Sequence, residues 1–293
     1  MIDWLFRFSR AVGLARRKPL SAPHIPAYRP SPDSLRAYGK RSGAVAGPRV
    51  VCYTAVMGEY GQLLAPEVVD VAIDYICFSD RPRYDFGVWQ VRNPPYGHSD
   101  PRRMARYVKT HPHDLFPEYD AVVWIDANIV VCGDLQRYIA LVKSGASGLG
   151  LIVHPHHDSY VSEAEKCIRK GKGERSLLKK QVRAYRKAGL KENGLYETGF
   201  MVALMHDERL RRFFRLWWDE IEAFSSRDQI ALAWVLERMQ FPVTKLLPEG
   251  MSVRDDCDFK YFSHKATAAL EISEEYRSLG RVQCPSGIGK EMN

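Results

Sequence analysis

Two oxygen-bearing side chains stand at the end of a strongly apolar run. Asp126 ends the run that begins at residue 121, and Asn128 follows two positions later. If the run is a β-strand, side chains two residues apart leave the chain on the same side and can reach one ligand. Carboxylate and amide oxygens are ligands for Mn²⁺ or Mg²⁺. Asp126 and Asn128 are therefore candidate metal ligands; the alternative is that they only cap and shape a turn.

Three basic residues stand where a helix would place them on one face. Arg102, Arg106 and Lys109 are four and three residues apart, just before the run that ends in Asp126. Residues at these spacings are neighbours on a helix surface. Because the planar guanidinium fork donates two parallel hydrogen bonds, arginine suits a diphosphate. This face is a candidate anion site, and a solvated helix surface is the alternative.

A histidine cluster follows a later apolar run, with Pro155 inside it. Proline excludes the helical i, i+4 spacing of the histidines in zinc hydrolases, and no H-E-x-x-H motif occurs in the sequence. We therefore expect His154 and His156 to contact a substrate. The alternative is a metal centre built on His154, His156 and His157, which would indicate a metal-dependent hydrolase.

The elements that must position these residues alternate along the chain. Apolar runs predict strands at residues 49–56, 74–79, 87–91, 121–126, 150–154 and 199–204. Amphipathic stretches predict helices at residues 101–110, 134–144, 161–188, 207–224 and 226–240. Fully apolar strands are typical of sheets covered on both faces, and their alternation with helices predicts an α/β fold with a largely parallel sheet. Ligands bind such sheets at the carboxyl ends of the strands.

The two ends of the chain differ from this central part. Residues 1–48 combine a basic, aromatic segment, predicted to be a short helix, with a proline-rich stretch that indicates a linker,. The helix either lies at a membrane surface or packs on the folded part. We expect the folded domain to cover residues 49–270 and a tail to cover residues 271–293.

Composition and charge narrow the class of protein. The chain has 293 residues, 45% of them hydrophobic, and a net charge of +8, which is ordinary for a globular protein,. The basic excess is concentrated in residues 1–45 and 166–191 without a nucleic-acid-reading motif, so no nucleic acid is expected as a partner. Scattered cysteines, no membrane-length apolar run and no recognisable signal peptide predict a cytoplasmic protein, at most peripheral to the inner face of the membrane,.

Seven short motifs occur in a fixed order over residues 49–265. They are YTAVMGEY (53–60), YICFSD (75–80), RMARYVKTHPH (103–113), WIDANI (124–129), HPH (154–156), GLYETGF (194–200) and RDQI (227–230). This stretch resembles a glycosyltransferase-like family formerly described as a domain of unknown function, with plant mucilage-type and bacterial capsule-associated members. That family is similar in turn to retaining, metal-dependent GT-A glycosyltransferases. The resemblance implies a GT-A-like (Rossmann-like) mixed, largely parallel sheet flanked by helices.

The resemblance also implies a donor site and a metal site. Tyr60 would stack on the nucleotide base and Asp80 would accept a base N–H. The remaining implied donor-binding residues are Thr54, Arg102, Arg106 and Lys109. The implied metal ligands are Asp126, Asn128 and His264, with Asn128 standing where the related enzymes carry a second aspartate. An amide oxygen still coordinates a cation, although it holds it more weakly.

The implied catalytic groups come later in the chain. Asp228, with Gln229 beside it, would lie beneath the anomeric carbon, where negative charge stabilises an oxocarbenium-like transition state. Glu197 would be catalytic or bind the acceptor. A purely structural role is the alternative for Asp228: with Ser225 or Ser226 as N-cap, it would favour the dipole of a helix.

These implications together predict a hexosyltransferase-like, retaining enzyme. It would move a sugar from a nucleotide-sugar donor, expected to be UDP-linked, to a glycan or glycolipid acceptor in surface polysaccharide synthesis, such as that of a capsule, with Mn²⁺ or Mg²⁺ as cofactor. The hydrolase described above and a non-catalytic glycan-binding protein are the alternatives.

The sharpest charge feature of the chain is the segment 166–191, with eleven basic residues and one acid. Leu177, Leu178, Val182 and Tyr185 form one helical stripe that can pack while the cations face outward. Such a surface either serves solubility only or attracts an anionic acceptor, an acidic polysaccharide or a lipid-linked glycan.

Overall fold

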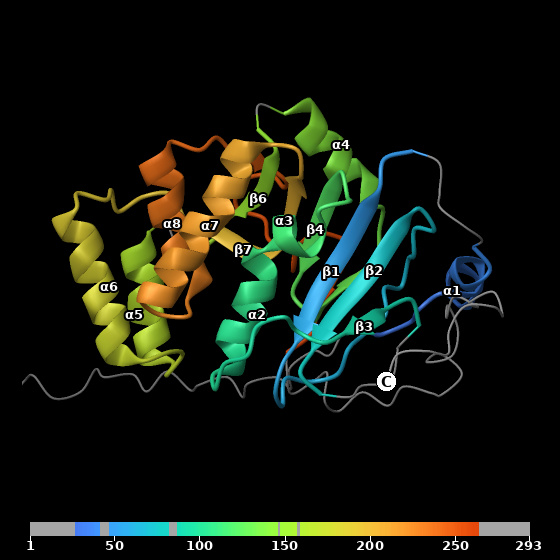
Figure 1. Cartoon of the computed structure of the whole chain (residues 1–293), viewed down its shortest axis with the longest axis horizontal. Coiled ribbons are helices and arrows are strands. Elements are labelled where there is room, and N and C mark those ends of the chain that lie inside the picture. The colour runs from blue at the N-terminus through green and yellow to red at the C-terminus, as the bar shows by residue number, and fades with distance from the viewer. Residues whose placement is uncertain (1–26, 42–46, 82–86, 146, 157–158, 264–293) are drawn as a thin grey trace, which may run out of the picture.

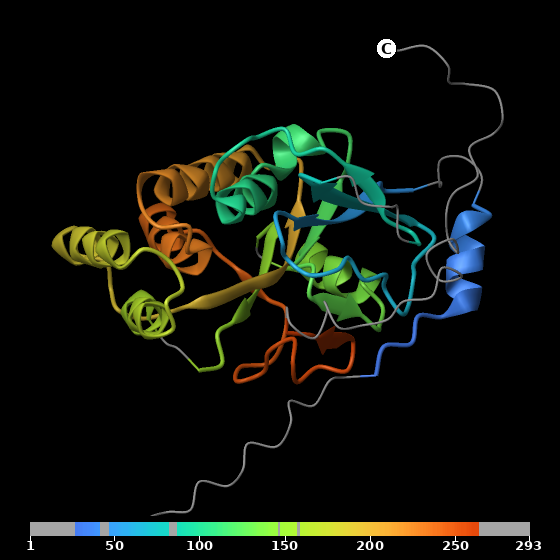
Figure 2. The ribbon, with the colours of Figure 1, turned by 90° about the horizontal axis from the view of Figure 1, so that it is seen from below.

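The computed structural model describes residues 27–41, 47–81, 87–145, 147–156 and 159–263. A seven-stranded sheet runs through the described part, with helices on both of its faces (Figures 1 and 2). The strands are β1 (Val50–Val56), β2 (Ile73–Ser79), β3 (Gln90–Arg92), β4 (Ala121–Ile125), β5 (Ile129–Val131), β6 (Leu149–Val153), β7 (Tyr196–Leu204), β8 (Thr244–Lys245) and β9 (Phe259–Tyr261). The helices are α1 (Pro32–Gly39), α2 (Pro101–Thr110), α3 (Pro112–Leu115), α4 (Gln136–Ser144), α5 (Tyr160–Arg169), α6 (Arg175–Lys187), α7 (Glu208–Ala223) and α8 (Asp228–Met239).

The strand order of the large sheet is β3-β2-β1-β4-β7-β6-β8, and β5 pairs with β9 in a second sheet of two strands. β3, β2, β1 and β4 are parallel, β7 is antiparallel to both β4 and β6, and β8 is parallel to β6. The predicted α/β fold with a mixed, largely parallel sheet flanked by helices is confirmed. Because β1 and β4 are parallel neighbours, the segments that follow them emerge at the same edge of the sheet.

Both faces of the sheet are covered, as the apolar strands predicted. Val123 of β4 belongs to the core on the side of α1 and α4, together with Tyr138. Val122 and Trp124 belong to the core on the opposite side, where Trp217 of α7 packs. Neighbouring residues of one strand point to opposite faces, so a strand buried on both sides has no polar position.

The segment predicted as one helix over residues 161–188 is two helices. α5 ends at Arg169 and α6 begins at Arg175. Gly171 and Gly173 have φ values of 63° and 104°, a backbone region that glycine adopts without steric cost and that ends a helix,. The break lets α5 and α6 pack side by side against α8, at the end of the molecule away from α1 (Figures 1 and 2).

The predicted linker is wrong for residues 32–39, which form α1. The Ser31 side chain accepts a hydrogen bond from the Ser34 N–H, and Pro32 opens the helix,. Leu35 and Tyr38 are buried in the core of one sheet face. The proline content of this segment indicated a linker, but Ser31 and Pro32 form a helix start, and this local signal determines the structure. The predicted N-terminal helix over residues 1–20 and the tail over residues 271–293 lie outside the described residues, and the boundary at residue 270 stays a prediction.

In the described part of the chain, no helix has both the length and the apolar character that crossing a membrane requires.

Candidate active site

A cleft of about 340 Å³ opens where β1 and β4 end. Its walls come from the segment after β1, from α2, from the segment joining β4 to β5, from α5, from the start of β7 and from the start of α8. Nine residues singled out from the sequence line it: Tyr60, Arg102, Arg106, Asp126, Asn128, His154, Glu197, Asp228 and Gln229. The structure therefore gathers residues more than 160 positions apart into one site.

Asp126 presents one carboxylate oxygen to the cleft. Its backbone N–H donates to the Gly199 carbonyl (2.8 Å), which continues the pairing of β4 with β7. Its Oδ1 accepts a hydrogen bond from Trp124 Nε1 (2.9 Å) and lies 3.2 Å from Lys109 Nζ. The side chain is 34% exposed. Because Oδ1 is held by protein groups, Oδ2 is the oxygen best placed to meet a ligand.

Asn128 is buried and its amide orientation is fixed. Its Nδ2 donates to the Phe262 carbonyl (2.8 Å), and its own carbonyl accepts the Phe262 N–H (2.8 Å). Since the amide nitrogen is engaged, the amide oxygen is the atom that can serve a cation. One carboxylate and one amide oxygen in one cleft fit Mn²⁺ or Mg²⁺, but the Lys109 ammonium beside Asp126 opposes a second positive charge. The third predicted ligand, His264, lies outside the described residues.

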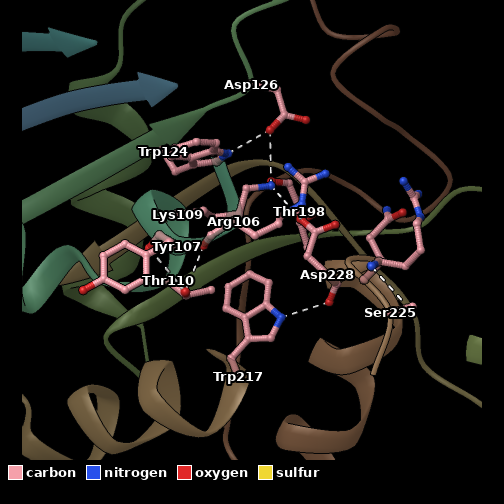
Figure 3. A network of polar contacts seen from close by, with 12 residues as sticks. Arg106, Tyr107, Lys109, Thr110, Trp124, Asp126, Thr198, Trp217, Ser225 and Asp228 are labelled. Atoms are coloured by element: carbon pink, nitrogen blue, oxygen red, sulfur yellow. Dashed lines mark hydrogen bonds and ion pairs between the residues drawn. The ribbon is translucent and has the colours of Figure 1, made fainter. Parts of the chain in front are cut away.

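A buried network of charges forms the base of the cleft (Figure 3). Lys109 has no exposed surface; its Nζ donates to Asp228 Oδ2 (2.7 Å) and to the Thr198 carbonyl (2.9 Å). Asp228 is only 2% exposed and also accepts from Thr198 Oγ1 (2.8 Å), while Arg106 Nε lies 3.2 Å away. Burial would raise the pKa of Asp228, but Arg106 and Lys109 outweigh it and hold this pKa well below its ordinary value,.

This network corrects two predictions. Lys109 was expected to contact the donor, but its ammonium is buried and has protein partners on three sides. Ser225 and Ser226 were candidate N-caps, but α8 has Arg227 as its N-cap residue, and Ser225 Oγ donates to Gln181 Oε1 (2.5 Å). The position of Asp228 is therefore fixed by its ion pairs with Arg106 and Lys109. In addition, Trp217 Nε1 donates a hydrogen bond to the backbone carbonyl oxygen of Asp228 (2.9 Å).

Glu197 lines the cleft, and the pKa of its carboxyl group is raised toward neutral pH. It is buried at the start of β7, with Oε1 3.6 Å from Arg254 Nη1. No hydrogen-bond partner for Oε2 occurs among the described residues. Burial raises the pKa of Glu197 to about 7, although the Arg254 cation acts in the opposite direction,. Such a group exists in both protonation states near neutral pH and can exchange a proton with a ligand.

The predicted donor residues divide into those in the cleft and those behind it. Along α2, the exposed fraction of the side chain falls from 46% for Arg102 to 17% for Arg106 and 0% for Lys109. The two arginines therefore face the cleft, whereas the third cation supports it. Tyr60 is exposed and lines the cleft.

Two other predicted donor residues lie outside the cleft lining, and the prediction for Thr54 is wrong. Thr54 is fully buried within β1 and does not line the cleft. Asp80 is not a lining residue either: both of its carboxylate oxygens accept the Gly58 N–H (2.9 and 3.0 Å). Asp80 therefore shapes the loop that carries Tyr60, and its predicted contact with the base stays a prediction.

A family model described as the TOD1/MUCI70 glycosyltransferase-like domain matches residues 44–267. The match covers about three quarters of the chain and contains every lining residue of the cleft. This chain belongs to the TOD1/MUCI70 glycosyltransferase-like family. A curated relative from Arabidopsis thaliana, named probable hexosyltransferase MUCI70, is 27% identical over 168 residues, covering 52% of this chain and 28% of the relative. The chain thus spans less than a third of the length of that protein.

Three solved structures show partial likeness to the chain. The bifunctional glycosyltransferase WbbM in its apo form is 13% identical, with a TM-score of 0.41 over 71% of this chain and 40% of that one. Core-mannan synthase A (CmsA/Ktr4) from Aspergillus fumigatus in a Mn/GDP form is 12% identical, with a TM-score of 0.42 over 74% and 76%. Galactosyltransferase LgtC with donor and acceptor sugar analogs is 14% identical, with a TM-score of 0.38 over 64% and 70%. Family membership rests on the family model alone.

In this member of the TOD1/MUCI70 family, the histidines do not form a metal centre in the described structure. His154 lines the cleft and its Nδ1 accepts the His156 N–H (3.1 Å), but His156 is exposed and outside the lining. His157 lies outside the described residues. Among the residues that the structure describes, the three-residue group with metal-ligand spacing is 256–258, which contains no histidine and lies outside the cleft lining. Within the part of the chain that the structure describes, the cleft lining contains no second histidine beside His154.

Several lining residues were missed by sequence reasoning. Arg254 comes from an irregular segment before β9, where no periodicity or motif marks it. Glu163, Lys166, Lys172 and Arg227 line the end of the cleft formed by α5 and the start of α8. The basic segment 166–191 stands out in the sequence as a surface feature, but only the packing of α5 against α8 brings part of it to the cleft.

Proposed function

We propose that this chain is a GT-A-type glycosyltransferase that uses a nucleotide-sugar donor. The observation that carries the proposal is the position of Asp126: it directly follows the central strand β4 and points an oxygen into a cleft that also holds Arg102 and Arg106. A cleft with fixed cations and a carboxylate at one sheet edge suits a pyrophosphate-linked sugar. Membership of a glycosyltransferase-like family supports the same reaction class.

In this proposal, the donor lies across the mouth of the cleft. Tyr60 stacks on the base, which we propose to be uracil, and the guanidinium groups of Arg102 and Arg106 bind the diphosphate. Asp126 and the amide oxygen of Asn128 would hold Mn²⁺ or Mg²⁺. When bound, that cation neutralises charge on the departing nucleoside diphosphate. Lys109 holds Asp126 in place from behind.

The sugar ring would then lie between Asp228, Gln229 and Glu197. Asp228 is ionised because two cations hold it so, and its negative charge stabilises the positive charge that develops at the anomeric carbon,. Glu197 in its ionised form accepts a hydrogen bond or a proton from the acceptor hydroxyl group, and His154 contacts the acceptor. We propose a hexosyl transfer with retention of configuration: the acceptor oxygen bonds to the anomeric carbon on the face from which the nucleoside diphosphate leaves, while Asp228 stabilises positive charge from the opposite face.

The acceptor is proposed to be a glycan or lipid-linked glycan in surface polysaccharide synthesis. The curated relative is named as a probable hexosyltransferase, which supports a hexose as the transferred group. We further propose that the protein acts in the cytoplasm, in peripheral contact with the inner face of the membrane.

The test is ligand-dependent stabilisation. Thermal unfolding would be followed with UDP-linked and GDP-linked sugars, each with and without Mn²⁺, for the native chain and Asp126→Ala. A ligand that binds only the native state raises the Tm. We expect a UDP-sugar to raise the Tm more in the presence of Mn²⁺, and Asp126→Ala to lose that additional rise. No rise with any nucleotide sugar at millimolar concentration would overturn the donor assignment and favour a non-catalytic glycan-binding protein.

A further inference from the structure

α6 carries an unbalanced positive charge on its exposed side. Its cations are Arg175, Lys179, Lys180, Arg183, Arg186 and Lys187, and all six are exposed. The helix contains no acidic residue. Its buried side consists of Leu178, Gln181 and Tyr185, which pack toward α5 and α8. The predicted packed stripe is confirmed for Leu178 and Tyr185 and in part for Val182, whereas Leu177 does not belong to the packed cluster.

Along the exposed side of α6, several of these cations repel one another. Arg175, Lys179 and Arg183 stand four residues apart, and like charges at this spacing are destabilising. An ion pair between Arg186 and Glu192 (2.6 Å), beyond the helix end, offsets only part of this charge. Packing of Tyr185, whose hydroxyl group donates to Glu220 Oε2 (2.7 Å), holds α6 in place instead. A solubilising helix needs charge, but it does not need charge of one sign.

The positive surface reaches the cleft. Lys166 and Lys172 line the cleft, together with Arg227. A Cβ added to Gly173 would lie 3.7 Å from Arg227 Cγ, so the turn that leads into α6 runs directly past this cleft residue. Glu163 is the acid at this end: it pairs with Arg227 (3.0 Å) and Lys166 (3.3 Å). Glu163 and the exposed Glu174, which directly precedes α6, are outnumbered by the cations at this end of the cleft and on the helix, so the excess positive charge continues from the cleft onto α6.

We propose that this continuous surface, from Lys166, Lys172 and Arg227 to the exposed side of α6, binds an acceptor glycan that carries repeated carboxylate groups. The inference rests on the proposed function and names the acceptor class for the same cleft. Arg175, Lys179 and Arg183 follow one another at about 6 Å along the helix axis, and the 13-residue helix is about 20 Å long, so it matches a linear polyanion,.

The side chains favour a glycan over a membrane surface. A helix that lies in a membrane interface presents large apolar groups next to its cations. The large hydrophobic side chains exposed among the described residues are Tyr60, Val68, Val71 and Leu141, and none belongs to α6. An extended polyanion needs only the cations, whereas a bilayer would find no fully exposed large apolar side chain on this helix to bury.

The test is direct binding, which does not depend on catalysis. The probe is a fluorescent alginate oligosaccharide, a polyuronate, compared with a neutral dextran of equal length, phosphatidylserine vesicles and a single-stranded oligonucleotide. The variant replaces Lys179, Lys180, Arg183 and Arg186 with Gln, which keeps helix propensity nearly unchanged. The control replaces Lys40, Lys143, Arg212 and Arg215 with Gln; these cations are also exposed, do not line the cleft and lie on or next to other helices. Circular dichroism checks that both variants fold.

We expect the native chain to bind alginate but not dextran, with affinity that falls as salt screens the charges. The α6 variant should weaken alginate binding by about tenfold, consistent with small contributions from four exposed ion pairs, and the control should not. Equal weakening by both variants would show that only net charge matters and would overturn the proposal. Preferential binding of vesicles or of the oligonucleotide would also overturn it. Since no donor is present, loss of the donor assignment would leave these results unaffected.

Discussion

Lys109 Nζ and Asp228 Oδ2 are 2.7 Å apart and neither residue has more than 2% of its side chain exposed. The pair joins α2 to the first residue of α8, and the same ammonium lies 3.2 Å from Asp126 Oδ1. One buried cation therefore holds both the strand-end carboxylate of the candidate active site and the carboxylate at its base. Its removal would leave negative charge at the base of the cleft with fewer partners.

We expect Lys109→Met to destabilise the fold by roughly 3–5 kcal/mol, because removing one partner of a buried ion pair leaves the other charge uncompensated. Combining it with Asp228→Asn should recover a large part of this loss, since the buried charge is then absent. Guanidinium unfolding of the two single variants and the double variant measures the coupling. Additive losses in the double variant would contradict a direct Lys109–Asp228 interaction.

The sequence predicted the core of this site through features that are local in the chain. Asp126 could be found because a carboxylate that directly follows a fully apolar strand contrasts sharply with the residues before it. Arg102 and Arg106 could be found because helical spacing places them together. The burial of Lys109 could not be predicted, since it depends on Thr198 and Asp228, which only the tertiary fold brings to α2.

The misplaced elements have equally specific causes. The interval between α5 and α6 is rich in lysine and continues the helical pattern, so Gly171 and Gly173 were the only local signs of a break. β5 and β9 are three residues each, and such short strands form because residues 129–131 and 259–261 pair across the fold, not because of their own sequence. The apolar strands β1, β2, β4, β6 and β7 were predictable from their own residues, whereas a helix break marked by two glycines and elements made by distant pairing were not.

Asp126→Ala should reduce sugar transfer by at least about 10²-fold, the size of effect seen when one electrostatic group of an active site is removed. Its carboxylate is partly exposed to the cleft, and Lys109 keeps Asp228 and the Thr198 carbonyl as partners when it is removed, so the fold should be retained. Donor turnover with Mn²⁺ in excess is the measurement. Asp33→Ala, at a solvent-exposed carboxylate on α1, is the control and should retain full activity. Full activity in Asp126→Ala would remove Asp126 from the mechanism.

Arg106→Ala should raise the KM for the donor by about tenfold and also lower kcat, because a phosphate contact acts in the ground state and in the transition state. Arg212→Ala on the exposed side of α7 is the matched control. Steady-state kinetics with the donor as the varied substrate decide the outcome. If KM and kcat are both unchanged, Arg106 serves only to hold Asp228.

Glu197→Gln should change how stability depends on pH. The native pKa of about 7 lies above the ordinary value of 4.5, so between these pH values the folded chain keeps a proton that the unfolded chain has released. Stability from this group is therefore fully present below pH 4.5 and is lost as the pH rises to about 7. The total change is about 3 kcal/mol, and Gln at this position cannot contribute it. The free energy of unfolding of the native chain relative to Glu197→Gln should thus fall by this amount between pH 4.5 and pH 8. Urea unfolding at several pH values measures it, with the exposed Glu118→Gln as control. A difference that does not vary with pH would show that Glu197 is ionised throughout, and the proposed proton exchange with the acceptor near neutral pH would then be wrong.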